Sequence, residues 1–165
     1  MKTINQLTAL LKEHSPLKAA HTESVVEIVK KVLKEMNVTS SEKEVAILVA
    51  QSHNFGWTKF RKEFCEKTTK YTDREFQLMT IYPQLGAMAL SENGHPSEVI
   101  EGVRLHASSF DESLPLSARI VRFARDFRKV LEFKTIGDAL IEFEGLAGDV
   151  YDAKVVAAAK VAFSK

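Results

Sequence analysis

The clearest structural signal in the chain is residues 15–36, SPLKAAHTESVVEIVKKVLKEM. Ser15 followed by Pro16 is typical of a helix N-cap and a first helical position, because proline lacks an N–H that the first turn leaves unbonded anyway. Apolar side chains then recur every three or four residues, at Leu17, Ala20, Val25, Ile28, Val29, Val32, Leu33 and Met36. This spacing predicts an amphipathic helix over 16–36.

The rest of the chain continues the helical pattern. Ser41 with Glu44, and Thr72 with Glu75, have the spacing of capping boxes, and the apolar run after Glu44 predicts a helix buried on nearly all sides. The further expected helices restart at Pro83, begin near Pro96 and Pro115, and cover about 135–147 and 152–163. No alternation of period two competes with them. We therefore expect an all-α fold: one compact bundle of about seven to eight helices over 1–165.

Charge balance, cysteine content and the length of the apolar runs exclude several classes of protein. The 165 residues include 23 Lys plus Arg and 22 Asp plus Glu, and this balance gives no reason to expect nucleic acid or an anionic membrane as a partner. A single cysteine, Cys65, excludes an intramolecular disulfide. The longest apolar run, Val45–Ala50, is too short to span a bilayer, and residues 1–20 lack the apolar core of a secretory signal. We expect a soluble, cytoplasmic protein.

Three histidines fall on or near apolar stripes of separate expected helices. His21 shares a face with Val25 and Ile28, His53 ends the helix of Val45–Ala50, and His106 ends the helix that follows Pro96. Histidines from several helices that meet in a bundle core can hold a metal ion. The alternative is that each is a structural residue with its own hydrogen bonds.

Several segments in fixed order match a known family. They are His21-Thr-Glu-Ser-Val25, His53-Asn-Phe-Gly56, KTTKYTDREF at 67–76, YPQLG at 82–86, LPLSARIV at 114–121 and AGDVYD at 147–152. In these segments the chain resembles the HD-GYP branch of the HD superfamily, over roughly 20–163. The resemblance implies a helical fold of metal-dependent phosphohydrolases, many of which cleave cyclic di-GMP.

The resemblance also implies metal-ligand positions, and four of them have changed. Asn54 replaces the aspartate of the His-Asp pair, and Tyr82 replaces a histidine. Leu105 leaves His106 as the remnant of an adjacent histidine pair, and Arg125 aligns with a late aspartate. The family's Gly-Tyr-Pro tripeptide is absent from the sequence.

These changes remove the charge that a two-metal hydrolase needs. An amide carries no charge, and a phenol with a reference pKa of about 10 stays protonated at neutral pH. A guanidinium about 6 Å from a divalent cation is repelled by roughly 5 kcal/mol at an effective dielectric constant of about 20. A full binuclear centre is therefore not expected, and His21, His53 and His106 are the remnant ligand positions.

Two functions follow as hypotheses. The first is a catalytically inactive HD-GYP-like domain that serves as a regulatory, ligand-binding or protein-interaction module. We expect it to need no cofactor and to bind a nucleotide, a protein partner or a second copy of itself. Its candidate phosphate contacts are Lys67, Lys70, Arg104 and Arg119, with solvated side chains as the alternative. The second is a metal-dependent phosphohydrolase or phosphodiesterase of the cyclic di-GMP class, in which the three histidines hold one Zn, Fe or Mn ion, helped by Asp126 or Asp111.

Overall fold

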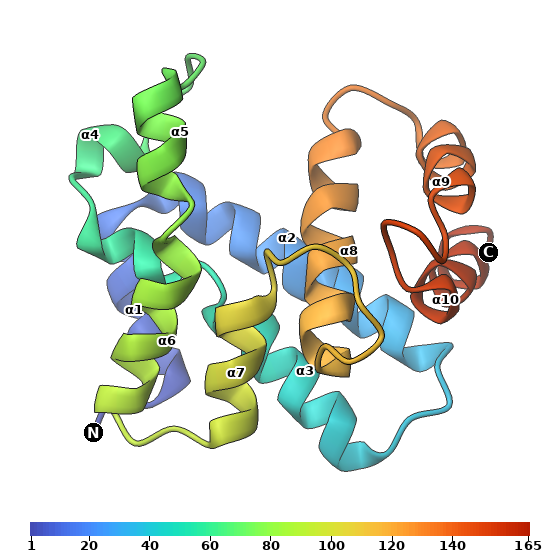
Figure 1. Ribbon diagram of the computed structural model, residues 1–165, viewed down its shortest axis with the longest axis horizontal. Coiled ribbons are helices and arrows are strands. Elements are labelled where there is room, and N and C mark those ends of the chain that lie inside the picture. Colours follow the sequence, from blue (N-terminus) through green and yellow to red (C-terminus); the bar gives the residue numbers. More distant parts are fainter.

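The computed structural model describes residues 1–165, and helices joined by loops make up the fold (Figure 1). The α-helices are α1 (Ile4–His14), α2 (Pro16–Lys34), α3 (Ser40–Ser52), α4 (Lys62–Cys65), α5 (Asp73–Met79), α6 (Tyr82–Glu92), α7 (Ser97–Leu105), α8 (Leu116–Val130), α9 (Ile136–Gly145) and α10 (Ala153–Phe163). A 3₁₀ helix, η1, spans Phe55–Lys59. The only β-type pairing is an isolated bridge between Ala147 and Tyr151. The all-α prediction is confirmed.

Local signals placed several helix ends correctly. The Ser15 side chain accepts a hydrogen bond from Lys18 N, 3.2 Å away, and Pro16 opens α2. Thr72 and Glu75 form the expected capping box at α5. The chain restarts as α6 with Pro83 in its first turn, where the missing N–H costs nothing.

Two details at α3 differ from the prediction. Its capping box is formed by Thr39 and Glu42, two residues earlier than Ser41 with Glu44, and the Glu42 carboxylate accepts a 2.8 Å hydrogen bond from Thr39 N. The helix is also less enclosed than expected, because Val45, Ile47 and Leu48 remain half-buried. Its inner face, which includes Val49, is fully buried.

The structure has ten α-helices because two elements were not expected from the sequence. One is the four-residue α4. The other is α1, where Thr3 and Gln6 form a capping box and Leu7 and Leu11 are buried one turn apart. None of the helices is both long and apolar enough to cross a membrane.

The helices enclose one hydrophobic core. α2 runs through the middle of the molecule and packs against α1, α3, α8 and α10 (Figure 1). α8 packs against α2, α3 and α7. Residues at the ends of α3 and α7 and on the facing sides of α2 and α8 are therefore brought together at the centre.

A close backbone contact between η1 and α6 positions Tyr82. A Cβ atom on Gly56 would lie 1.9 Å from the Tyr82 carbonyl oxygen, so only glycine allows the two elements to approach this closely. The contact stacks the rings of Trp57 and Tyr82, whose centroids are 5.1 Å apart. The Tyr82 side chain is thereby held in the core beside the ends of α3 and α7.

Candidate functional site

The structure brings the three histidines together. His21 lies on α2, whereas His53 and His106 are the C-cap residues of α3 and α7. The ring centroids of His21 and His53 are 6.1 Å apart, and those of His53 and His106 are 5.2 Å apart. His53 and His106 are fully buried. We refer to these three residues as the histidine cluster.

Backbone carbonyls fix the tautomers of two members of the cluster. His53 Nδ1 lies 2.7 Å from Ala50 O, and His106 Nδ1 lies 2.6 Å from Val103 O. Because a carbonyl oxygen can only accept, each Nδ1 carries the proton. Each Nε2 therefore presents a lone pair to its surroundings.

Asn54 fixes the opposite tautomer in His21. The Thr22 hydroxyl donates to Lys18 O at 2.8 Å, so its oxygen accepts from Asn54 Nδ2 at 3.0 Å. The same amide nitrogen faces His21 Nδ1 at 3.4 Å and can only donate to it. The proton of His21 is therefore on Nε2.

Two nitrogen atoms of the cluster have no hydrogen-bond partner in the protein. They are the buried Nε2 atoms of His21 and His53. From the tautomers above, the first is an N–H donor and the second an acceptor. Buried polar groups are nearly always satisfied, so this pair marks a place where a ligand or water can bind.

The Nε2 atom of His106, by contrast, belongs to a continuous hydrogen-bond chain. The Tyr82 hydroxyl donates to His106 Nε2 at 2.9 Å. Arg125 donates from its guanidinium to the Tyr82 oxygen at 3.3 Å and from Nε to Asp126 Oδ1 at 2.9 Å. Two positions expected to have lost metal ligands thus hold Tyr82 and Arg125. The two side chains are hydrogen-bonded to each other, and Tyr82 is also hydrogen-bonded to His106.

No carboxylate is free beside the cluster. Besides Arg125, Asp126 accepts hydrogen bonds from Arg122 Nε at 3.0 Å and from the Tyr151 hydroxyl at 3.1 Å. Asp111 lies in an exposed loop. Leu105, at the end of α7, is half-buried and supplies no polar side-chain atom.

The three histidines of the cluster are neutral at pH 7. Burial, and secondarily the charge of Lys129, lowers the pKa of His21 to about 4. Burial, together with the charge of Arg125, lowers the pKa of His106 to about 3. Burial also holds the pKa of His53 well below its usual value. The cluster itself therefore contributes no charge at neutral pH.

Arg125 and Asp126 are both ionised. Burial alone would lower the pKa of Arg125, but Tyr82 and Asp126 raise it above its ordinary value. Burial alone would raise the pKa of Asp126, but Arg125 and Arg122 lower it. Burial raises the pKa of Tyr82, which stays protonated and can donate to His106.

The four cations predicted as phosphate contacts do not converge on the cluster. Lys67 and Lys70 lie between α4 and α5, Arg104 is on α7 and Arg119 is in the first turn of α8. Lys67 pairs with Glu75 at 2.6 Å and Arg104 with Glu101 at 3.1 Å, and Arg119 pairs with Asp152. Of the four, only Lys70 has no carboxylate partner, and it is exposed.

Other cations, which the sequence analysis did not select, act on His21. They are Lys18 on α2 and Arg125, Arg128 and Lys129 on α8. Lys18 and His21 are three residues apart, and Arg128 and Lys129 follow Arg125 by three and four residues. These helical spacings were a usable signal, because residues so separated share a helix face.

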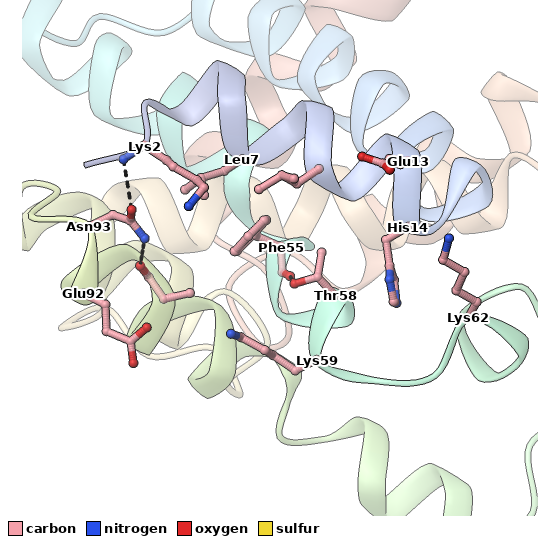
Figure 2. Close-up of a pocket in the computed structure, with 12 residues that line it drawn as sticks. Lys2, Leu7, Glu13, His14, Phe55, Thr58, Lys59, Lys62, Glu92 and Asn93 are labelled. Atoms are coloured by element: carbon pink, nitrogen blue, oxygen red, sulfur yellow. Dashed lines mark hydrogen bonds between the residues drawn. The ribbon is translucent and has the colours of Figure 1, made fainter.

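A separate groove of about 530 Å³ lies between α1, η1 and α6 (Figure 2). Phe55 and Leu7 contribute apolar surface to it, and Lys2, Lys59 and Glu92 stand around it. None of the three clustered histidines lines this groove. It shares η1 with the surroundings of the cluster but is a distinct feature.

Comparison with known proteins identifies the family. Residues 5–155 match the HD domain family, which is most of the chain. The chain therefore belongs to the HD domain family. No curated protein matches it significantly in sequence.

A solved structure shares the fold. It is the crystal structure of the HD domain of the L. monocytogenes phosphodiesterase PgpH in complex with cyclic-di-AMP. The TM-score is 0.71 at 12% sequence identity, over 96% of this chain and 94% of the other. At this identity the similarity establishes the helical HD architecture.

The fold family implies divalent metal ions, and the described residues fit such a centre poorly. Only His53 directs an unoccupied Nε2 lone pair toward the cluster, because His21 Nε2 carries a proton and His106 Nε2 accepts from Tyr82. No group of three or more His, Cys, Asp or Glu side chains has the arrangement of a metal site. The positive charge of Arg125 further disfavours a divalent cation.

Proposed function

We propose that this chain is a degenerate HD-GYP-type domain that does not hydrolyse phosphodiesters and serves as a regulatory, ligand-binding or protein-interaction module. The observation that supports this proposal is the chain of hydrogen bonds from Asp126 through Arg125 and Tyr82 to His106. These side chains satisfy one another without a metal ion. The proposed module requires no cofactor.

Electrostatics supports the same conclusion. At an effective dielectric constant of about 20, a guanidinium about 6 Å from a divalent ion costs roughly 5 kcal/mol, or between three and four powers of ten in affinity. The adjacent Asp126 offsets little of this repulsion, because Arg122 also pairs with it. The neutral histidines add no negative charge to compensate.

The ligand that we propose for such a module is a nucleotide. The PgpH HD domain, which shares the fold, was solved with cyclic-di-AMP. A protein partner or a second copy of the chain is the other route by which an inactive domain can act.

Hydrolysis assays test the proposal. Purified protein is incubated with cyclic di-GMP and, separately, cyclic-di-AMP in the presence of Mn²⁺, Fe²⁺ or Mg²⁺, beside His53→Ala as a matched control. We expect no turnover above that of the control. Metal-dependent turnover that disappears in His53→Ala would overturn the proposal.

The unoccupied Nε2 lone pair of the buried His53 favours a second candidate, a phosphohydrolase with a reduced metal site. The residues that would hold one Zn, Fe or Mn ion are His21, His53 and His106, and the ion would supply an activated water. Single alanine substitutions at the three positions should then each abolish turnover. Turnover retained in all three variants would dispose of this candidate.

A further inference from the structure

Cationic side chains from two helices gather beside His21. Lys18 precedes His21 by one turn of α2, and Arg128 and Lys129 follow Arg125 by one turn of α8. α2 and α8 pack directly against each other. Both helices therefore contribute positive charge in the neighbourhood of His21.

Two of these cations have no acidic partner. Lys18 lies 3.9 Å from the centroid of the Trp57 ring and forms no ion pair, and Lys129 forms none either. Arg128 pairs with Glu132 at 3.2 Å. The half-buried position of Lys18 lowers its pKa, and partial desolvation together with the charge of Arg125 lowers the pKa of the more exposed Lys129, so a counter-anion would stabilise both ammonium groups.

The acidic groups nearby are already engaged. Asp126 pairs with Arg125 and Arg122, and Glu132 with Arg128. Glu66, which faces Lys18, accepts hydrogen bonds at the start of α2 from the Ser15 hydroxyl and from Leu17 N. No carboxylate remains to neutralise the two lysines.

The cluster beneath these cations offers an unused donor and an unused acceptor. His21 Nε2–H can donate to an anionic oxygen, and His53 Nε2 can accept from a hydroxyl. His53 is fully buried, so leaving its nitrogen unpartnered is costly. A phosphoryl group that also carries an O–H, or that lies beside a sugar hydroxyl, supplies an anionic oxygen for His21 Nε2–H and a hydroxyl for His53 Nε2.

We propose that Lys18, Lys129 and Arg128, with His21 Nε2–H as the directional donor, form a metal-independent binding site for a phosphoryl group at the histidine cluster. This inference rests on the proposed function, because it requires that no divalent ion occupies the cluster. The charge that repels such an ion is the charge that attracts the phosphoryl anion. The source of the phosphoryl group is a nucleotide or free phosphate.

The chain carries its own reporter for the test. Trp57 is the only tryptophan, and Lys18 lies over its ring. Inorganic phosphate and, separately, adenosine 5′-monophosphate are titrated into the full chain at constant ionic strength set with KCl. Trp57 fluorescence and the NMR signals of the histidine rings are both recorded.

We expect saturable changes that a matched KCl titration does not produce. Lys129→Met, an exposed and conservative change, should weaken binding by about tenfold or more. Lys134→Met is the control, because Lys134 pairs with Glu142 and is not among the cations that act on His21, and the affinity of this variant should equal that of the wild type. Tighter binding of the nucleotide identifies a nucleotide as the source, and equal binding identifies the phosphate group alone.

Two outcomes overturn the inference: no saturation by either readout, or a Lys129→Met variant with wild-type affinity. A different result would overturn the proposed function. Absent phosphate binding together with absent hydrolysis removes this inference and leaves the inactive domain standing, whereas metal-dependent hydrolysis removes the inactive domain whether or not phosphate binds.

Discussion

The buried neutral histidines make the stability of the fold depend on pH, and His106→Gln measures the contribution of one of them. The pKa of His106 is lowered from 6.5 to about 3. Because the folded-state pKa is the lower one, the unfolded chain binds the extra proton, and stability is lost as the pH falls below about 6.5. Between about pH 6 and about pH 5 this difference is close to one proton, which costs about 1.2 kcal/mol.

His21 and His53 shift in the same direction as His106. His21 and His106 together should remove roughly 2–2.5 kcal/mol of stability over that unit of pH, and His53 adds to the loss in the same direction. Unperturbed carboxylates titrate at about pH 4 and contribute little in this window.

Urea unfolding across a pH series is the assay. In His106→Gln the loss of unfolding free energy between about pH 6 and about pH 5 should be smaller than in the wild type by about 1.2 kcal/mol. The glutamine side chain can still accept the hydrogen bond of the Tyr82 hydroxyl. Above about pH 7.5, where imidazoles are neutral in both states, the two proteins should have equal pH slopes. A variant that keeps the wild-type slope at acidic pH would show that the lowered pKa of His106 does not contribute to the pH dependence of stability.

Three further predictions use the same unfolding assay or NMR. Gly56→Ala should lower the free energy of unfolding by at least about 3 kcal/mol or prevent folding, because the new Cβ would lie 1.9 Å from Tyr82 O. Gly145→Ala is the control: no atom lies within 4 Å of its Cβ, so its stability should stay within about 1 kcal/mol of the wild type, and equal effects in the two variants would contradict the close contact of η1 and α6. Arg119→Met should lower the free energy of unfolding by about 3–5 kcal/mol, because it leaves the buried Asp152 carboxylate unpaired. Lys134→Met removes an exposed ion pair and should lower it by about 1 kcal/mol or less, and a small loss in both variants would show that the Asp152 carboxylate does not need Arg119. Asn54→Asp should raise the pKa of His21 above about 4, because a carboxylate can accept a hydrogen bond from Nδ1–H and stabilises the imidazolium. An unchanged histidine titration by NMR would show that Asn54 does not control that ring.

The helices were predictable where the signal is local. The apolar spacing and the Ser15-Pro16 start define α2 without reference to the rest of the chain. α1 escaped prediction because its burial depends on α2, α3 and η1, which pack over Leu7 and Leu11. The shift of the α3 cap from Ser41 to Thr39 reflects two overlapping capping-box patterns, between which the sequence offers no choice.

The site was predictable in part for a similar reason. His21, His53 and His106 could be expected to meet because each lies on or near an apolar stripe that must face a common core. The cations could not be assigned from the sequence, because their partners come from tertiary structure: Arg119 pairs with Asp152, thirty-three residues away. The bond between Tyr82 and His106 likewise depends on the approach of η1 to α6.

Elemental analysis of the purified protein measures whether the histidine cluster holds a divalent metal ion. The full chain and His53→Ala are each equilibrated with an excess of Zn²⁺, Mn²⁺ or Fe²⁺, freed of unbound metal by desalting, and measured for metal content per chain. We predict that both proteins retain the same low metal content, well below one ion per chain, because Arg125 and the neutral histidines disfavour a divalent cation. One or more ions per wild-type chain that are lost in His53→Ala would show instead that the histidine cluster holds a metal.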